Sequence, residues 1–503
     1  MSIPFAEKTI ELDQRVVDFL KDGPKKLYIG GEFVPSISGK TFDTINPSTG
    51  EVITSVYEAD EKDVDRAVDL AEKVFYNEWS KVTANERGKL LWRLADLIEE
   101  HLEPLAQLES LDNGKPISHA RTIDLPLTIE HFRYYAGWAT KIHGEVIENS
   151  AGPHMLTYTR REPIGVVGQI IPWNFPMLML AWKMGAALAT GNVLVFKTAE
   201  QTPLSALYLA NLINEAGFPK GVVNILSGFG ETAGEAIVKH PRIRKVAFTG
   251  STAVGKHIQR QAADNLKRLS LELGGKSPNI IFSDADLSRA IPGSMIAIFF
   301  NMGQACSAGS RLYVHKKVYD KVLDEMASRA KKMQLGMGLS EETEIGPLVS
   351  NEQFSRVNRF LEEGHEAGAE AIIGGQPIDR SGYFIPPTIF ADVDRNMSIS
   401  QEEIFGPVLA ATPFEDEDDL TDIIRMANDT EYGLAAGVWT TDIRKAHRVA
   451  HQIEAGTVWV NEYNALDAAV PFGGYKQSGY GREMGQHALE LYTQVKSVWV
   501  NLN

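Results

Sequence analysis

The sequence is poor in cysteine, since Cys306 is the only one among 503 residues. A single cysteine excludes an intrachain disulfide framework and fits a reducing compartment. Basic residues are not in excess either: 50 Lys and Arg stand against 66 Asp and Glu, which gives a net charge of −16. A nucleic acid or an anionic membrane surface would require a basic face, so we expect neither as a partner.

Long hydrophobic runs and targeting segments are also missing. The most apolar stretch, residues 166–196, is interrupted by Pro172, Asn174, Pro176 and Lys183, which indicates buried core rather than a membrane span. The N-terminus has no basic segment followed by an apolar one, and the C-terminal "VKSVWVNLN" carries no address tag. We therefore expect a cytoplasmic protein.

Two kinds of hydrophobic periodicity are present. Residues 60–135 repeat apolar positions at helical spacing, whereas short β-branched runs begin at residues 164, 192, 221, 244 and 267, with helix-like stretches between them. Strands that alternate with helices predict βαβ units, so the fold class is α/β, with a doubly wound parallel sheet. A second α/β region follows Gly275. "MLTYTRRE" and "LYTQVKSVWVN" alternate like strands outside these units, either as ordinary edge strands or as an edge that pairs with another chain.

The ends of the predicted parallel strands are where a doubly wound sheet binds ligands. The first strand is followed by "IPWNFP" and not by G-x-G-x-x-G, which taken alone argues against a dinucleotide. The second ends in "VFKTAEQTP", where Glu200 and Lys197 are suited to the hydroxyls of an adenosine ribose, or form a plain surface pair. The fourth ends in "FTGSTAVGKHI", where Gly250 and Ser251 lead into a helix whose N-terminus offers free N–H groups to phosphate.

Three further residues have the chemistry of a covalent catalytic site. Glu272 follows the fifth strand beside two glycines, and a partly buried carboxylate there would have the raised pKa that suits a general base. Cys306 lies among small residues in "NMGQACSAGS". A lone cysteine is most often an inert buried residue, but a thiolate nucleophile needs such space and a nearby proton acceptor. The Asn174 side-chain amide could donate to an oxyanion, or it holds a turn between two prolines.

Taken together, these segments resemble the NAD-dependent aldehyde dehydrogenase superfamily. The resemblance runs from about residue 25 to the C-terminus and is carried, in the family's order, by "PWNFP", "KTAEQTPLSALY", "FTGSTAVGK", "LELGGKSPNI", "GQACSAGSR", "EEIFGPVL" and "PFGGYKQSGYGRE". It is closest to the tetrameric class of cytosolic and mitochondrial aldehyde dehydrogenases. That family binds NAD without the glycine fingerprint, which would account for "IPWNFP".

The resemblance implies a role for each candidate residue. Cys306 looks like the nucleophile, Glu272 like the base that activates the hydrolytic water, and Asn174 with the Cys306 backbone N–H like the oxyanion hole. The implied cofactor residues for NAD are Ile170, Pro172, Trp173, Lys197, Glu200, Gly230, Phe248, Gly250, Ser251, Val254, Leu273, Gly274, Gln353, Arg356, Glu403 and Phe405. The implied substrate pocket comprises Phe175, Met179, Trp182, Ala305, Ser307, Leu466 and Phe472. No metal-binding cluster is expected.

The resemblance also implies a domain plan: a non-standard Rossmann-like NAD-binding domain from residues 21–143 and 165–274, a catalytic domain from 275–488, and oligomerisation strands from 144–164 and 489–503. The implied partners are a small-molecule aldehyde and three further copies of the chain in a homotetramer. The apolar pocket favours aliphatic or aromatic aldehydes. Other readings are a specialist for betaine aldehyde or a semialdehyde, a cofactor-independent esterase, and a non-catalytic structural homologue.

Overall fold

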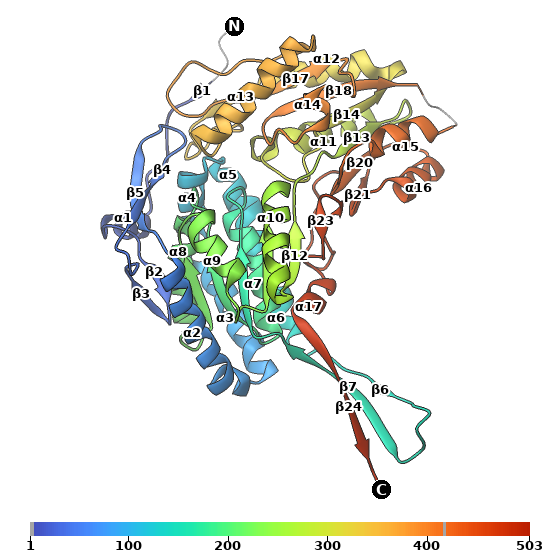
Figure 1. Ribbon diagram of the computed structural model, residues 1–503. Helices are drawn as coiled ribbons and strands as arrows, with labels where there is room; N and C mark the ends of the chain where they lie inside the picture. Colours follow the sequence, from blue (N-terminus) through green and yellow to red (C-terminus); the bar gives the residue numbers. More distant parts are fainter. Residues whose placement is uncertain (1–4, 416–418) are drawn as a thin grey trace.

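Two large sheets organise the chain in a computed structural model that describes residues 5–415 and 419–503 (Figure 1). The five strands predicted from the β-branched runs form the parallel centre of the first sheet. Its order across the sheet is β23 (Gly479–Tyr480), β12 (Arg268–Glu272), β11 (Lys245–Thr249), β8 (Val166–Ile170), β9 (Val193–Lys197), β10 (Val223–Leu226), β2 (Leu27–Ile29) and β3 (Glu32–Val34). The predicted doubly wound α/β fold is confirmed.

The strand order of this sheet creates a crevice. The chain runs from β8 outward through β9 to β10, and β11 then returns to the other side of β8. Successive connections therefore leave the carboxyl ends of β8 and β11 in opposite directions, which is the point where open α/β sheets bind ligands. The segments that follow these two strands are "IPWNFP" and "GSTAVGK".

A second sheet of seven strands lies in the other half of the molecule (Figure 1). It is parallel except at the edge strand β16. Its order is β16 (Glu370–Ile373), β17 (Thr388–Ala391), β18 (Val408–Phe414), β14 (Arg311–His315), β13 (Pro278–Ile281), β20 (Ala435–Trp439) and β21 (Thr457–Val460). Strand β23 comes from the segment that the sequence assigns to this half, yet it pairs with β12 at the edge of the first sheet.

A three-stranded antiparallel arm projects from the body, with the C-terminus at its far end (Figure 1). The two alternating segments noted in the sequence, β7 (Met155–Pro163) and β24 (Thr493–Asn501), pair along their whole length, and β6 (Val146–Ile147) adds an edge. Smaller two-stranded pairs are β1 (Phe5–Ala6) with β15 (Leu335–Gly336), β4 (Thr41–Ile45) with β5 (Val52–Tyr57), and β19 (Tyr432–Gly433) with β22 (Tyr475–Lys476).

Helices cover both faces of the first sheet, and several begin at residues that satisfy their free N–H groups. Asp60 with Asp63, and Thr83 with Glu86, form capping boxes at two of them. The helices of the first half are α1 (Gln14–Lys21), α2 (Glu61–Asn77), α3 (Ala84–Glu100), α4 (Leu102–Asn113), α5 (Ile117–His119), α6 (Leu125–Trp138), α7 (Pro176–Ala189), α8 (Leu204–Ala216), α9 (Glu235–Lys239) and α10 (Thr252–Ala262).

The helices of the second half surround the second sheet. They are α11 (Leu287–Phe299), α12 (Tyr319–Ala330), α13 (Asn351–Glu366), α14 (Ser398–Gln401), α15 (Thr421–Asn428) and α16 (Ile443–Gln452). The last helix, α17 (His487–Leu491), lies at the base of the arm and contacts α7 and β24 instead (Figure 1). Asp284 ties this half together, because its carboxylate accepts hydrogen bonds from Thr440, Thr441 and Asp442 and pairs with Lys445 at 3.1 Å. No helix within the described residues is both long and apolar enough to cross a membrane.

Candidate active site

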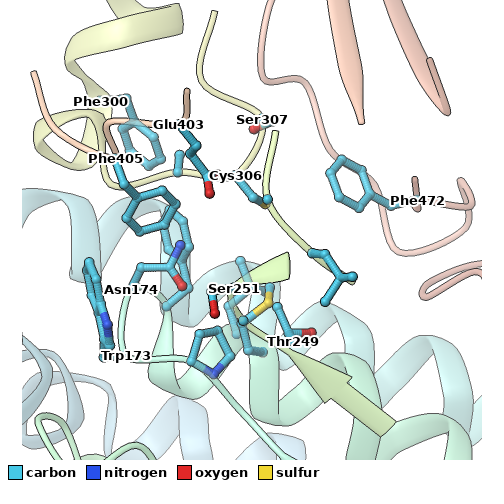
Figure 2. A pocket seen from close by; sticks show the side chains of 18 of the residues that line it. Trp173, Asn174, Thr249, Ser251, Phe300, Cys306, Ser307, Glu403, Phe405 and Phe472 are labelled. Carbon is cyan, nitrogen blue, oxygen red and sulfur yellow. The ribbon is translucent and has the colours of Figure 1, made fainter. Parts of the chain in front are cut away.

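A cavity of about 590 Å³ opens at the crevice between the two halves. Its walls include residues that follow β8, β11 and β12 of the first sheet, together with Cys306 and Glu403 from the second half. Figure 2 shows Glu403 and Phe405 on one side of Cys306 and Phe472 on the other. The cavity therefore joins segments that lie more than a hundred residues apart in the sequence.

Most of the residues implied by the sequence line this cavity. Those in its wall are Pro172, Trp173, Asn174, Phe175, Met179, Trp182, Gly250, Ser251, Leu273, Gly274, Ala305, Cys306, Ser307, Gln353, Arg356, Glu403, Phe405, Leu466 and Phe472. Those outside its wall are Ile170, Lys197, Glu200, Gly230, Phe248, Val254 and Glu272. The second set, Glu272 included, belongs to strands of the first sheet or to the turns and helices that follow them.

The loop before Cys306 has a strained backbone. Asn301 and Met302 both have left-handed conformations, with φ of 50° and 56°, which are costly for side chains other than glycine. The Asn301 side-chain amide donates to the carbonyls of Asn174 and Gln304, each at 3.1 Å. These hydrogen bonds tie the cysteine loop to the loop after β8 and so hold Cys306 near Asn174.

The environment of Cys306 opposes ionisation of its thiol. Burial raises the pKa of the thiol to about 12, and the nearby carboxylates of Glu403 and Glu272 add to the increase. The backbone N–H groups of Ser307 and Cys306 act in the opposite direction but are outweighed. These surroundings disfavour the thiolate, which is the form of cysteine that acts as a nucleophile.

Asn174 is buried in the same wall as Cys306, and its side-chain nitrogen donates to the Gln304 carbonyl at 2.9 Å. An amide NH₂ has two hydrogens, so one remains for a second acceptor. A hydrogen bond also holds the loop that carries Asn174: the Asn113 side-chain nitrogen donates to the Trp173 carbonyl at 2.7 Å. Asn174 thus presents a fixed hydrogen-bond donor, held by the carbonyl of Gln304, which precedes Cys306 by two residues.

Glu272 ends β12 and is buried, with neither carboxyl oxygen hydrogen-bonded. Burial raises its pKa well above the usual value; Glu483 raises it further, while Lys183 and Arg482 lower it. Lys183 and Glu483 form a buried ion pair at 2.8 Å. The carboxyl lies against Gly473, since a Cβ atom added there would be 2.8 Å from Oε1. Its raised pKa suits a general base, but its side chain must rotate to reach the cavity.

Glu403 lies in the cavity wall with Phe405, Gln353 and Arg356 around it. The Arg356 guanidinium donates to the Glu403 carbonyl at 2.6 Å, and the Gln353 amide donates to the Phe405 carbonyl at 2.8 Å. Phe405, with a φ of 61°, packs edge-on against Trp173 with ring centroids 5.2 Å apart. Burial raises the pKa of the Glu403 carboxyl to about 7.

The crevice, in the cavity wall and next to it, has donors and acceptors that could hold a dinucleotide. Lys197 is buried at the end of β9, and its ammonium contacts the Glu200 carboxylate at 3.2 Å. Ser251 caps α10 by accepting the Val254 N–H, and the other N–H groups of this first turn remain available for phosphate. With Glu403 at the inner end, these groups match the hydroxyls and phosphates of NAD.

The far end of the cavity is an apolar tunnel. Phe175 stacks on Phe300 with centroids 5.9 Å apart, and Trp182 packs edge-on against Phe472 at 5.3 Å. A buried ion cluster supports this wall: the Lys115 ammonium lies 4.5 Å from the centre of the Phe175 ring and pairs with Glu109 and Asp124. The tunnel has room for an apolar substrate chain and no exposed cation.

Several lining residues were not predicted from the sequence. They are Ile123, Asp124, Leu127, Leu178, Thr249, Thr252, Ala253, Ile296, Phe300, Glu352, Tyr432, Tyr463 and Asn464. Some had a signal, because Thr249, Thr252 and Ala253 stand within "FTGSTAVGK". Ile123 and Asp124 belong to a π-helical turn, Ala120–Asp124, and hydrophobic periodicity in the sequence does not predict where such a turn lies.

No group of three or more His, Cys, Asp or Glu side chains that could hold a metal ion occurs within residues 5–415 and 419–503.

Comparisons with known proteins agree with this geometry. The model of the aldehyde dehydrogenase family matches residues 33–498. The chain is 58% identical to DhaS of Bacillus subtilis (strain 168), over 98% of this chain and 99% of that protein. It is 51% identical to the mitochondrial aldehyde dehydrogenase of Homo sapiens, over 95% and 92%. The NAD⁺ complex of an aldehyde dehydrogenase from Bacillus cereus is 55% identical, with a TM-score of 0.96 over 99% of this chain and 100% of that one.

Proposed function

Because the chain belongs to the aldehyde dehydrogenase family and is an NAD-dependent enzyme that oxidises aldehydes, we propose that Cys306, Asn174 and Glu272 perform the reaction. The observation that carries this assignment is the cavity in which the only thiol of the chain lies beside a fixed amide donor. Glu403, Phe405, Lys197, Glu200 and the first turn of α10 would hold NAD.

The reaction begins when the Cys306 thiolate attacks the aldehyde carbon and the carbonyl π electrons move to oxygen. The Asn174 amide and the Cys306 backbone N–H donate to this oxyanion in the thiohemiacetal. When bound, NAD would supply the acceptor for a hydride, and loss of that hydride from the former aldehyde carbon would leave a thioester on Cys306. Glu272 then takes a proton from water, the water oxygen attacks the thioester carbon, and the carbon–sulfur bond breaks to release the acid.

The tunnel favours aliphatic and aromatic aldehydes, because Phe175, Met179, Trp182 and Leu466 offer apolar contacts and no cation. The test is a panel of acetaldehyde, longer alkanals, benzaldehyde, betaine aldehyde and a carboxylated semialdehyde, with NADH formation as the readout. We expect kcat/KM to rise with alkyl length and to be lowest for the two charged substrates. A preference for a charged aldehyde would contradict the proposed substrate class.

The arm of β6, β7 and β24 is the proposed oligomerisation element. It exposes large apolar side chains, among them Val146 at 78%, Val495 at 62% and Trp499 at 56%. Such a surface is typical of an interface between chains, and it supports a homotetramer built as a dimer of dimers. Removal of residues 493–503 should yield smaller particles in light scattering, whereas a full-length monomer would contradict the assignment.

The remaining assignments concern domains and location. The NAD-binding domain comprises residues 21–143 and 165–274, and the catalytic domain 275–488, with β23 reaching across to the first sheet. A cytoplasmic location fits the single cysteine. Limited proteolysis should spare the boundary near residue 275, because the segment between β12 and β13 is buried.

A further inference from the structure

A polar pair, Ser307 and Asn464, interrupts the apolar wall of the cavity beside the thiol. Both residues line the cavity, and Ser307 directly follows Cys306 in the chain (Figure 2). The Ser307 hydroxyl donates to Asn464 Oδ1 at 3.2 Å. Because consecutive Cα atoms are only about 3.8 Å apart, a substrate bonded to the sulfur has its first carbons near this pair.

The backbone on both sides of the pair is held in place. The Tyr463 hydroxyl donates to the Ser307 carbonyl at 2.8 Å. The buried Tyr463 ring packs against Gly309, where an added Cβ atom would lie 3.1 Å from it. The Trp459 indole N–H anchors the same segment by donating to the Ala465 carbonyl at 2.9 Å. These contacts fix the positions from which the two polar side chains reach the cavity.

Asn464 has a hydrogen-bond donor that the protein does not use. Its side-chain nitrogen is buried and has no hydrogen-bond partner within residues 5–415 and 419–503. Its backbone is left-handed, with a φ of 61°. Asparagine tolerates this conformation because its side chain can hydrogen-bond to nearby backbone, yet the Asn464 oxygen accepts from the Ser307 hydroxyl instead. The turn alone therefore does not account for this side chain.

Together the two side chains offer one donor and one acceptor. The Asn464 NH₂ group has free hydrogens, and the Ser307 oxygen, whose hydrogen goes to Asn464 Oδ1, keeps lone pairs that can accept. A hydroxyl group complements both, because its oxygen accepts and its hydrogen donates. A carbonyl or ether oxygen would satisfy only the Asn464 amide, and an alkyl chain would leave that buried amide unpaired.

We propose that Ser307 and Asn464 select aldehydes that carry a neutral hydroxyl group on carbon 2 or carbon 3. This inference rests on the proposed function, because it takes Cys306 as the residue that binds the aldehyde carbon. The substrate hydroxyl accepts from Asn464 and donates to Ser307. It is bound and not altered, so the product is the corresponding hydroxy acid.

The test compares substrates of equal chain length on the full-length enzyme. The pairs are propanal with 2-hydroxypropanal and butanal with 3-hydroxybutanal. The kcat/KM values are measured from NADH formation and are referred to the free aldehyde, since hydroxyaldehydes partly hydrate and dimerise in water. We expect the wild type to favour the hydroxylated member of at least one pair by at least about tenfold, because the plain alkanal leaves a buried donor unpaired.

Two variants and a control assign this preference to the pair. Ser307→Ala removes the acceptor, and Asn464→Gly removes the donor while glycine keeps the left-handed backbone. Each should bring the ratio of kcat/KM between the hydroxylated and the plain aldehyde to within about threefold of one. Asn461→Gly is the matched control, because Asn461 is also left-handed, with a φ of 55°, but does not line the cavity. Its ratio should equal that of the wild type.

A wild-type ratio near one for both pairs of substrates overturns the proposal. It is also overturned if either variant keeps the wild-type ratio, or if the ratio falls equally in Asn461→Gly. Circular dichroism checks folding, and if one variant does not fold, the other decides. Activity on the plain alkanals without a hydroxyl preference removes this inference alone, whereas a lack of NADH formation from all four aldehydes removes the proposed function.

Discussion

The replacement Asn174→Ala separates the catalytic from the structural role of this amide. If Asn174 donates to the oxyanion, its loss should reduce kcat by about 10²- to 10³-fold, or roughly 3–4 kcal/mol of transition-state stabilisation. The hydride-transfer burst should slow by the same factor, because the oxyanion forms before the hydride leaves. Stopped-flow measurement of NADH formation checks both quantities.

The structure predicts a much smaller effect of this variant on stability. The Asn174 side chain makes one hydrogen bond, to the Gln304 carbonyl, and that carbonyl also accepts from Asn301. Loss of one such bond typically costs about 1 kcal/mol, and the truncation adds a small cavity term. Urea unfolding should therefore show a decrease of roughly 1–2 kcal/mol, well below the kinetic effect.

Asn301→Gly is the matched control, because it removes the other donor to Gln304 and glycine tolerates the left-handed conformation. Asn301 does not line the cavity but its hydrogen bonds hold the Asn174 loop. This variant should therefore lose more stability than Asn174→Ala and should lower kcat less than Asn174→Ala does. If Asn174→Ala keeps kcat within about threefold of the wild type, the oxyanion assignment is wrong.

Four other changes test the buried charges, the base and one strained turn. Glu272→Gln should retain a first-turnover burst of NADH but little steady turnover. Equal loss of both would show that Glu272 is not the base in deacylation. Lys183→Met should lower the free energy of unfolding by about 3–5 kcal/mol because it strands a buried carboxylate, and adding Glu483→Gln should restore part of this loss. Asp284 has a lowered pKa because its hydrogen bonds outweigh burial, so the unfolded state binds the proton more readily. The stability advantage of wild type over Asp284→Asn should be constant above about pH 4 and disappear as the pH falls further. Leu266→Gly should raise stability by about 1 kcal/mol in urea unfolding, since Leu266 is 91% exposed with a φ of 53°.

The parallel centre of the fold was predictable because its signal is local. Four of the five strands, β8 to β11, are buried at every position, and a strand buried on both faces must read as a short apolar run. The edge strand β23 has no such signal: it is two residues long, and only its hydrogen bonds to Leu271 and Glu272 place it in the first sheet.

The site was predictable only in part, for a similar reason. Residues that follow strands, such as Trp173 and Ser251, could be placed at the crevice from strand order alone. Phe300 could not, because its place in the tunnel depends on stacking with Phe175 from another segment. The orientation of the Glu272 side chain could not be predicted from the sequence either. Its surroundings are Gly473 and the Lys183–Glu483 pair, which lie far from it along the chain.

The low polarity of the cavity wall around Cys306 has opposite effects on the two negative charges that the reaction needs, the oxyanion and the thiolate. Low polarity strengthens the hydrogen bond from Asn174 to a developing oxyanion, but the same burial raises the pKa of the thiol that must ionise first. The strained Asn301–Met302 backbone fixes these two groups relative to each other, so relaxation of the loop cannot relieve the conflict. Only a change in the neighbouring charges can, and the carboxylates of Glu403 and Glu272 are the charges available.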